Sequence, residues 1–201
     1  MTQKSKENQL AEVQFQFEEC RLCELNVTRT QLVFGEGNPN SKVVFIGEGP
    51  GRDEDLQGKP FVGRSGQLLS EVIFEVFQWN RNHYYITNIV KCRPTIDRQM
   101  IKDRPPEKKE IEACHPILLK QLDIIKPKVI VTVGSSATKA LLNTKEGITK
   151  LRGNWYDFHG SSLMPIFHPS YVLRNGGIRS PQYQQMKSDL ELVKNFLEIE
   201  K

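Results

Sequence analysis

The chain has 201 residues, of which 38% are apolar, 28 are Lys or Arg and 24 are Asp or Glu, so its formal net charge is +4. This composition is that of an ordinary globular protein and excludes wholesale disorder, while the small positive charge permits a nucleic-acid partner without establishing one. The longest strongly apolar stretch, around Val129–Val133, has the length of a strand and not of a membrane span. Met1–Gln9 is polar and lacks the apolar core of a signal peptide, so we expect a cytosolic protein.

The length predicts a single domain over residues 1–201, with residues 1–13 as a flexible or helical N-terminal extension. The first clear element is Val43–Ile46, a short apolar run that ends in a glycine-rich turn and therefore predicts a buried strand. Gly66–Phe77 carries apolar residues at helical spacing and predicts a helix. Tyr84–Ile89 predicts a second strand, and the Pro-rich, charged residues 93–106 predict a loop.

The second half of the chain continues the alternation of strands and helices. Glu107–Ile125 places its apolar residues on one helical face, and Val129–Val133 is the clearest strand of the sequence. A short helix through Leu142, a fourth strand over Met164–Phe167 and a last helix that spans Tyr183 to Leu197 follow. This order predicts an α/β fold of three layers, α/β/α, with a central, mostly parallel four-stranded sheet.

The chain has four cysteines, and two of them form a C-x-x-C pair. Cys20 and Cys23 make the pair, 68 residues separate Cys23 from Cys92, and 21 separate Cys92 from Cys114. Four thiolates with no cysteine left over suit a tetrahedral zinc site or a four-cysteine iron–sulfur cluster. A redox pair with two buried core cysteines is the alternative, and spacing alone does not choose between zinc and iron.

Polar segments follow three of the predicted strands. These segments are Gly47–Gly51, Asn88 within Thr87–Arg93, and His168–Asn175. Ligands bind beyond the carboxyl ends of parallel strands, so Glu48, Asn88 and His168 are expected to converge on one cleft. Pro169 favours an extended backbone at His168, which projects the imidazole from the strand end.

Each of these residues also has a plainer interpretation. The Gly47–Gly51 segment lacks the pattern of a dinucleotide or Walker loop and is read on its own as a tight turn. Asn88 alone predicts a turn residue, His168 a helix cap, and Phe61 a core residue or a stacking platform. The Lys and Arg residues around 91–109 alone predict a solvated loop.

Taken together, the motifs resemble the iron–sulfur uracil-DNA glycosylases, usually called family 4, over roughly residues 14 to 198. The sequence that carries the resemblance comprises the four cysteines, Thr28–Pro39, Gly47–Gly51, Gly58–Leu69, Thr87–Pro94 and His168–Asn175. One departure is the gap of 21 residues between the last two cysteines, which is longer than expected for the family. We place the excess in the loop Thr95–Pro106.

The resemblance implies a monofunctional glycosylase that flips deoxyuridine out of DNA and hydrolyses its N-glycosidic bond. It implies that His168 donates to the uracil O2 side as negative charge develops there. Asn88 would read the uracil edge, and Phe61 would stack on the flipped ring. Glu48, with the Gly49 backbone, would position or activate water, and Gly47 would help to form the pocket wall.

The resemblance also implies a DNA interface and a cofactor. The loop His168–Asn175 would enter the DNA, with Val172 or Leu173 as the wedge. Lys91 and Arg174 would contact phosphates. Cys20, Cys23, Cys92 and Cys114 would hold a structural [4Fe–4S] cluster. No lysine stands out as a Schiff-base nucleophile, so lyase activity is not expected.

The expected partner is uracil-containing DNA, single- or double-stranded. Other repair or replication proteins are candidate partners, and a monomeric, cytoplasmic, nucleoid-associated protein is expected. The competing hypothesis is a non-catalytic iron–sulfur or zinc module that binds uracil-containing DNA without turnover. The presence of Glu48, Asn88 and His168 together discriminates against this hypothesis, because a pure binder needs no such set.

Overall fold

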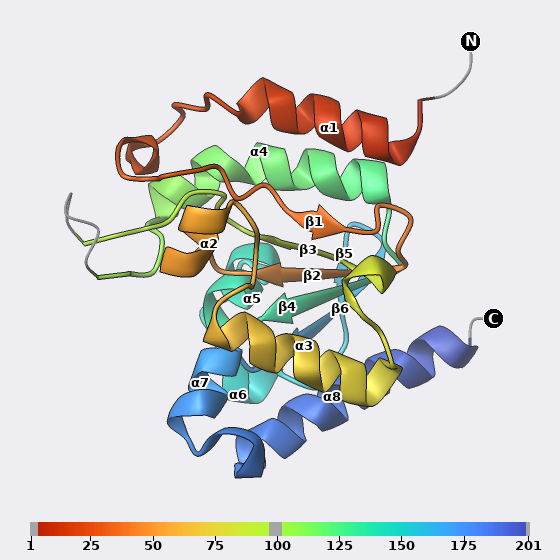
Figure 1. Ribbon diagram of the computed structural model, residues 1–201. Coiled ribbons are helices and arrows are strands. Elements are labelled where there is room, and N and C mark those ends of the chain that lie inside the picture. The colour runs from red at the N-terminus through yellow and green to blue at the C-terminus, as the bar shows by residue number, and fades with distance from the viewer. Residues whose placement is uncertain (1–3, 97–101, 200–201) are drawn as a thin grey trace.

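The computed structural model describes residues 4–96 and 102–199. Its centre is a sheet with the strand order β1-β3-β2-β4-β6-β5. The inner strands β3 (Tyr85–Asn88), β2 (Val43–Gly47), β4 (Val129–Val133) and β6 (Ser161–Ile166) are parallel. Their order confirms the predicted α/β class and places the carboxyl ends of all four strands at one edge of the sheet (Figure 1).

The sheet has two strands more than the four that the sequence predicts. These are β1 (Glu36–Gly37) and β5 (Tyr156–Phe158), which pair antiparallel at the two edges. Segments of two and three residues are too short to show the alternation by which strands are recognised in a sequence. They extend the sheet without altering the parallel centre that positions the strand ends.

Both faces of the sheet are covered by helices, because alternate residues of each inner strand are buried on opposite sides. On one face, Val43 and Phe45 pack with α3 (Arg64–Phe77) and α8 (Pro181–Ile199). On the other face, Val44 and Ile46 pack with α1 (Lys6–Phe17), α4 (Lys108–Ile125) and α5 (Ser135–Leu142). Strands buried on both faces read as continuous apolar runs, which explains why the sequence revealed them.

Short helices occupy the connections. In the described part of the chain, three are α-helical and three are 3₁₀ turns: α2 (Arg52–Gln57), α6 (Ile148–Leu151), α7 (Pro169–Arg174), Glu24–Val27, Arg81–His83 and Gly177–Arg179. The N-terminal helix α1 packs along α4, and Leu10 and Val13 are buried there (Figure 1). Residues 1–3 of the predicted extension and residues 97–101 of the predicted loop lie outside the described residues. Within the described ranges, no helix combines the length and the apolar character that crossing a bilayer requires.

Candidate active site

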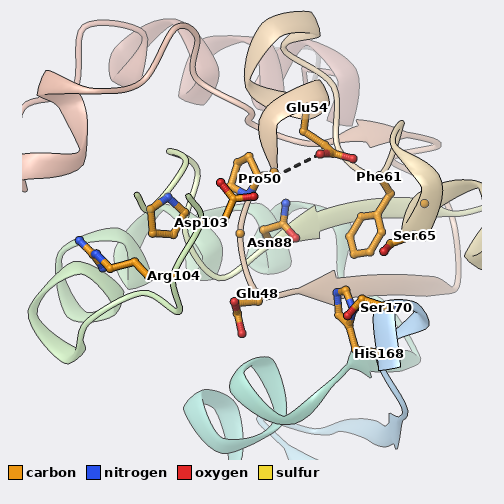
Figure 2. A pocket seen from close by; sticks show the side chains of 14 residues that line it. Glu48, Pro50, Glu54, Phe61, Ser65, Asn88, Asp103, Arg104, His168 and Ser170 are labelled. Atoms are coloured by element: carbon orange, nitrogen blue, oxygen red, sulfur yellow. Dashed lines mark hydrogen bonds between the residues drawn. The ribbon is translucent and has the colours of Figure 1, made fainter. Parts of the chain in front are cut away.

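A pocket opens at the carboxyl ends of the parallel strands, and it joins residues far apart in the sequence (Figure 2). Its volume is about 230 Å³. Ligand pockets for drug-sized molecules measure about 300–1,000 Å³, so this one suits a small ring. It is lined by Glu48, Gly49, Pro50, Gly51, Glu54, Phe61, Ser65, Gly66, Asn88, Pro94, Asp103, Arg104, His168 and Ser170. The predicted convergence of Glu48, Asn88 and His168 is therefore present in the structure.

Asn88, the last residue of β3, is 1% exposed. Its side-chain Nδ2 and Oδ1 are buried and have no hydrogen-bond partner among the described residues. Buried amides are nearly always hydrogen-bonded, and leaving both ends unpaired costs free energy. One donor and one acceptor side by side, facing a cavity, therefore indicate a ligand that presents an acceptor and a donor in return.

Phe61 lines the pocket beside Asn88, and Gly47, which is not among the lining residues, packs directly against both side chains. A Cβ atom at Gly47 would lie 2.4 Å from Phe61 Cζ and 2.5 Å from Asn88 Oδ1, so no other residue fits without displacing them. Phe61 has φ of 55°, an uncommon conformation for a residue with a side chain. Its carbonyl oxygen accepts a hydrogen bond from Arg81, and a Cβ at Gly66 would lie only 2.0 Å from that oxygen. The surrounding backbone therefore fixes the ring where a flat ligand would stack.

His168 precedes α7 in extended backbone, with φ −74° and ψ 134°, as the following proline predicts. Its Nδ1 accepts a hydrogen bond from the Ser170 backbone N–H at 3.1 Å. Burial, assisted by the positive charge of Arg174, lowers the pKa of His168 to about 4. Because Nδ1 is an acceptor and the ring is neutral near pH 7, its single proton resides on Nε2. His168 is both a helix cap and a neutral N–H donor at the pocket, where its ring centroid lies 6.4 Å from that of Phe61.

Glu48 lies directly after β2 and is half-buried. Its Oε2 accepts a hydrogen bond from Ser136 Oγ at the start of α5. Figure 2 shows its carboxylate directed towards that helix, away from Asn88. Glu48 and His168 also line a second hollow of about 470 Å³, which is bordered by Tyr171 and Arg174. Glu48 therefore lies at the border between the pocket and this second hollow.

Three residues of the pocket wall were missed by the sequence reasoning: Glu54, Asp103 and Arg104. Glu54 accepts hydrogen bonds from the backbone N–H groups of Gly51, Val62 and Gly63 at 3.1, 2.9 and 2.8 Å, so it joins the two glycine-containing turns. No strand ends at any of these residues, and no motif marked them. A sequence signal for Glu54 does exist, because a carboxylate three residues after Gly51 at the start of a helix is typical of a capping box.

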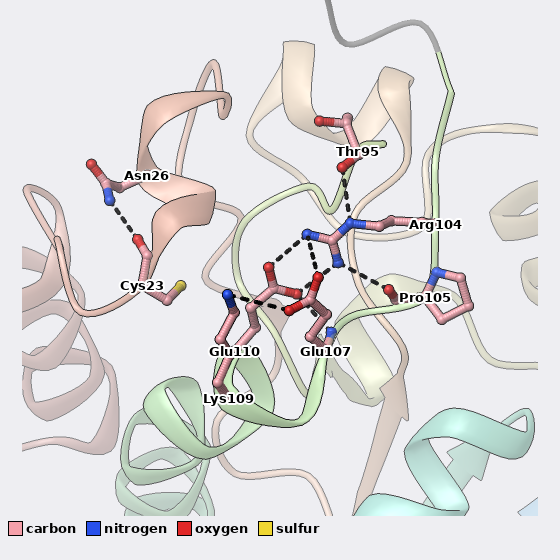
Figure 3. Close-up of polar contacts among 8 residues, drawn as sticks. All are labelled: Cys23, Asn26, Thr95, Arg104, Pro105, Glu107, Lys109 and Glu110. Atoms are coloured by element: carbon pink, nitrogen blue, oxygen red, sulfur yellow. Dashed lines mark hydrogen bonds and ion pairs between the residues drawn. The ribbon is translucent and has the colours of Figure 1, made fainter. Parts of the chain in front are cut away.

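Arg104 anchors the described end of the 95–106 loop to α4. Its guanidinium donates to the buried Glu110 carboxylate at 2.8 and 2.7 Å and to Thr95 O at 2.9 Å (Figure 3). Burial raises the pKa of Glu110, but the hydrogen bonds from Arg104 and from the Glu107 backbone, with the charge of Arg104, hold it below its usual value. Arg93 pairs with Asp103 at 2.6 Å in the same segment. These pairs hold Asp103 and Arg104 at the pocket.

The four residues predicted to contact DNA fall in different environments. Arg174 is exposed beside the second hollow, and Leu173 is half-buried against the core. Val172 lies on the buried side of α7 and is fully enclosed by the core, so the prediction that it is a wedge is contradicted. Lys91 is 0% exposed, and its ammonium bonds to Thr87 Oγ1 and Asn88 O. An ammonium enclosed in this way does not reach a phosphate, so that prediction for Lys91 is also wrong.

The four cysteines gather at the N-terminal half of α4. Arg29 donates to Cys92 Sγ and the Lys91 backbone N–H donates to Cys114 Sγ, both at 3.3 Å. Burial raises the pKa of Cys23 and Cys114, and it raises that of Cys92 to about 11; the charges of neighbouring cysteines act in the same direction. Among the described residues, no group of three or more His, Cys, Asp or Glu side chains is arranged to hold a metal ion. The four cysteines are nevertheless close enough for the charge of one thiolate to raise the pKa of another.

Comparison with known proteins agrees with this architecture. Residues 34–191 match the model of the uracil DNA glycosylase superfamily. A type-4 uracil-DNA glycosylase of Thermotoga maritima is 44% identical over 184 residues, which cover 90% of this chain and 91% of that protein. The type-4 enzymes of Sulfurisphaera tokodaii and Saccharolobus solfataricus are each 40% identical, with 87% and 89% of this chain and 80% and 82% of those proteins covered. The chain belongs to the uracil DNA glycosylase superfamily.

Proposed function

We propose that this chain is a type-4 uracil-DNA glycosylase that releases uracil from DNA by hydrolysis, with the pocket of Figure 2 as its active site. The observation that carries the proposal is the buried, unpartnered amide of Asn88. Its Nδ2–H₂ can donate to uracil O4 while its Oδ1 accepts from uracil N3–H. Cytosine presents the opposite pattern at these atoms, which would leave two buried groups unpaired. The same amide therefore binds uracil and rejects cytosine.

A base must leave the duplex to enter this pocket, because the pocket lies inside the protein fold. Flipping costs a few kcal/mol, less for a mismatched or single-stranded base. Stacking on Phe61 offsets part of that cost, since base–aromatic stacking contributes about 1–3 kcal/mol. Because Gly47 has no Cβ atom, Phe61 and Asn88 can lie close enough to contact one small ring together.

The reaction separates charge along the glycosidic bond, and this chain has groups suited to each side. Uracil departs as an anion, so a neutral His168 Nε2–H directed at O2 stabilises the transition state more than the substrate. The sugar becomes positively charged, and the Glu48 carboxylate favours that charge and orients the attacking water. Ser136 holds this carboxylate through its hydroxyl. One donor of this kind is typically worth about 10²–10³ in rate.

The four cysteines fit a [4Fe–4S] cluster by the chemistry of their donors. Cys20, Cys23, Cys92 and Cys114 offer four sulfurs in one apolar neighbourhood, and Cys92 and Cys114 each receive an N–H hydrogen bond. Hydrogen bonds to cysteine sulfur are common around such clusters. When bound, the cluster cross-links the segment that carries Cys20 and Cys23 to α4, and base excision needs no electron transfer from it. Iron in the purified protein together with absorbance near 400 nm would indicate the cluster. Zinc without that absorbance would indicate a zinc site.

The experiment is a uracil-release assay on single- and double-stranded DNA that carries one uracil or one cytosine. Wild type is compared with Asn88→Ala, His168→Ala and the control Asn195→Ala, which alters an exposed amide on α8. We expect wild type and control to release uracil and retain cytosine, and both pocket variants to lose about 10²-fold or more in rate. DNA binding without release by wild type would favour the non-catalytic module. Full activity in both pocket variants would exclude this pocket.

A further inference from the structure

Lys91 is a buried cation whose burial the proposed reaction does not use. The side chain is 0% exposed, yet an ammonium is strongly hydrated and costly to bury. Among the described residues, no Asp or Glu forms an ion pair with it. Its ammonium instead donates to Thr87 Oγ1 at 2.5 Å and to Asn88 O at 2.8 Å. Both acceptors belong to the end of β3, and one of them is the backbone of the residue that reads the base.

The backbone of Lys91 contacts the cysteine site. Its N–H donates to Cys114 Sγ at 3.3 Å, and Cys92 is the next residue. Its carbonyl accepts from the Val33 N–H at 2.8 Å, which fixes the peptide from the other side. One residue therefore contacts the sulfur site through its main chain and the active-site strand through its side chain.

The turn between Asn88 and Lys91 is also held by backbone bonds to the end of β2 and by the burial of Ile89 and Val90 in the core. The Ile89 N–H donates to Gly47 O at 2.9 Å, and the Val90 N–H donates to Glu48 O at 3.3 Å. Thr87 Oγ1, which accepts from the Lys91 ammonium, donates in turn to Phe34 O at 2.7 Å. The Asn88 amide has no protein partner to orient it, so its direction follows from its backbone and from the packing around it. The bond from Lys91 to Asn88 O restrains that backbone directly.

We propose that Lys91 is a positioning residue that holds Asn88 in the orientation for uracil and ties it to the four-cysteine site. The inference rests on the proposed role of Asn88. Lys91 touches neither the base nor the DNA, and it acts through the carbonyl of Asn88. The cysteine site thereby supports base recognition as well as holding the N-terminal segment. A misplacement of about 1 Å at a reacting centre can cost about 10²-fold in rate, so a restraint of this kind is strong enough to matter.

The test is a double-mutant cycle on the full metal-loaded protein. The variants are Lys91→Met, which keeps the length of the side chain but removes its donors, Asn88→Ala and the double variant. Ser41→Ala is the matched control, because this buried hydroxyl also bonds to strand backbone, with the carbonyls of Val43 and His83 within reach as acceptors, at the opposite end of β2. Each protein is assayed for kcat/KM on uracil-containing DNA, for the Kd of free uracil by calorimetry and for thermal unfolding, at equal metal content.

We expect Lys91→Met to lose about 10-fold to 10²-fold in kcat/KM and to bind free uracil more weakly, while Ser41→Ala of similar stability changes neither. In the Asn88→Ala background, Lys91→Met should add less than about twofold, because residues that act as a unit are not additive. An equal loss in both backgrounds, or no loss beyond that of the control, overturns the inference. If Lys91→Met does not fold, Lys91→Gln, which shortens the reach of the side chain, is put through the same cycle. Failure of wild type to release uracil would instead remove the proposed function.

Discussion

The Ser170 backbone N–H donates to His168 Nδ1 at 3.1 Å, and this contact decides which ring nitrogen carries the proton. A neutral imidazole that accepts at Nδ1 is a donor at Nε2. The contact arises because His168 caps α7, whose first N–H groups need acceptors. The capping role and the proposed catalytic role are therefore two consequences of one geometry.

We predict that His168 stays neutral across the physiological range. Burial, then the charge of Arg174, lowers its pKa to about 4, so kcat/KM should show no titration of this group between pH 8 and pH 5 and should fall only as pH approaches 4. The pH profile of uracil release, together with an NMR titration of the ring, measures this. Arg174→Ala is expected to raise the pKa of His168. A titration of His168 near pH 6.5, its usual value, would contradict the neutral-donor assignment.

The same shift has a consequence for stability. The unfolded chain takes up a proton at His168 near pH 6.5 and the folded chain only near pH 4, so the unfolded state binds more protons between these values. The free energy of unfolding should therefore fall as pH decreases from 6.5 to 4. His168→Gln removes this contribution, and the difference between the two proteins over that window isolates it.

We predict that Gly47→Ala closes the active site without unfolding the protein. The new Cβ would lie 2.4 Å from Phe61 Cζ and 2.5 Å from Asn88 Oδ1, so both side chains must move out of the positions proposed for the base. Uracil release should fall by about 10²-fold or more, by analogy with a misplacement of about 1 Å. Gly147→Ala is the control, because its Cβ meets no atom within 4 Å. Normal uracil release by Gly47→Ala would show that the base does not bind between Phe61 and Asn88.

The convergence of the strand ends could be predicted from sequence, because parallel strands bring their carboxyl ends to one edge. That rule alone predicts that Glu48, Asn88 and His168 surround one cavity, as they do in the structure. That rule does not reach Asp103 and Arg104, because they arrive at the pocket from a loop, held by ion pairs with Arg93 and Glu110. Which charges of an irregular loop pair with one another depends on the conformation of that loop, and no helical or strand periodicity marks it.

The sequence also does not predict which individual residues near the site are buried. Lys91 follows a strand end in a basic segment, where an exposed lysine is the usual expectation, yet its side chain folds back to Asn88 O. Val172 lies in the polar loop that follows His168, but α7 turns it into the core. A short helix of six residues offers too little periodicity to show which of its sides is buried.

We predict that Ser136→Ala slows uracil release by about tenfold, the effect of losing one hydrogen bond of about 1.4 kcal/mol to a charged group. The Ser136 hydroxyl donates to Glu48 Oε2, and without it the carboxylate is free to rotate away from the sugar. Ser136→Thr should retain most of the rate because it keeps the hydroxyl. Ser162→Ala, at the opposite end of β6, is the control. An unchanged rate in Ser136→Ala would mean that Glu48 needs no such support.

We predict that Arg174→Ala weakens DNA binding in a manner that depends on salt and not on sequence. Arg174 is exposed at the hollow next to the pocket, where a phosphate of the flipped nucleotide would pass. Loss of one phosphate contact should reduce the slope of log K against log salt by about 1. The measurement is a binding titration on uracil-free DNA at several salt concentrations. Lys42→Ala, an exposed cation at the far end of β2, should leave the slope unchanged, and an unchanged slope in Arg174→Ala would remove it from the interface.

We predict that Glu110→Gln lowers the free energy of unfolding by about 2 kcal/mol, less than the 3–5 kcal/mol of a fully buried pair because Arg104 is 23% exposed. The hydrogen bonds and charge of Arg104 outweigh the opposing effect of burial and hold the pKa of Glu110 below its ordinary value of 4.5. A carboxylate with a lowered folded pKa stabilises the protein above its unfolded pKa, and that stabilisation is lost as pH falls through the folded pKa.

The difference in thermal stability between wild type and Glu110→Gln should therefore be largest near pH 7 and shrink as pH falls below about 4.5. Glu112→Gln is the matched control on the same helix, because Glu112 forms only an exposed pair with Lys108 at 3.6 Å, and such pairs contribute about 0–1 kcal/mol. Equal melting temperatures for the two variants would mean that the Arg104–Glu110 pair does not hold the pocket wall to α4. A specific loss in Glu110→Gln, accompanied by a weaker affinity for uracil, would establish that this wall depends on the helix that carries Cys114.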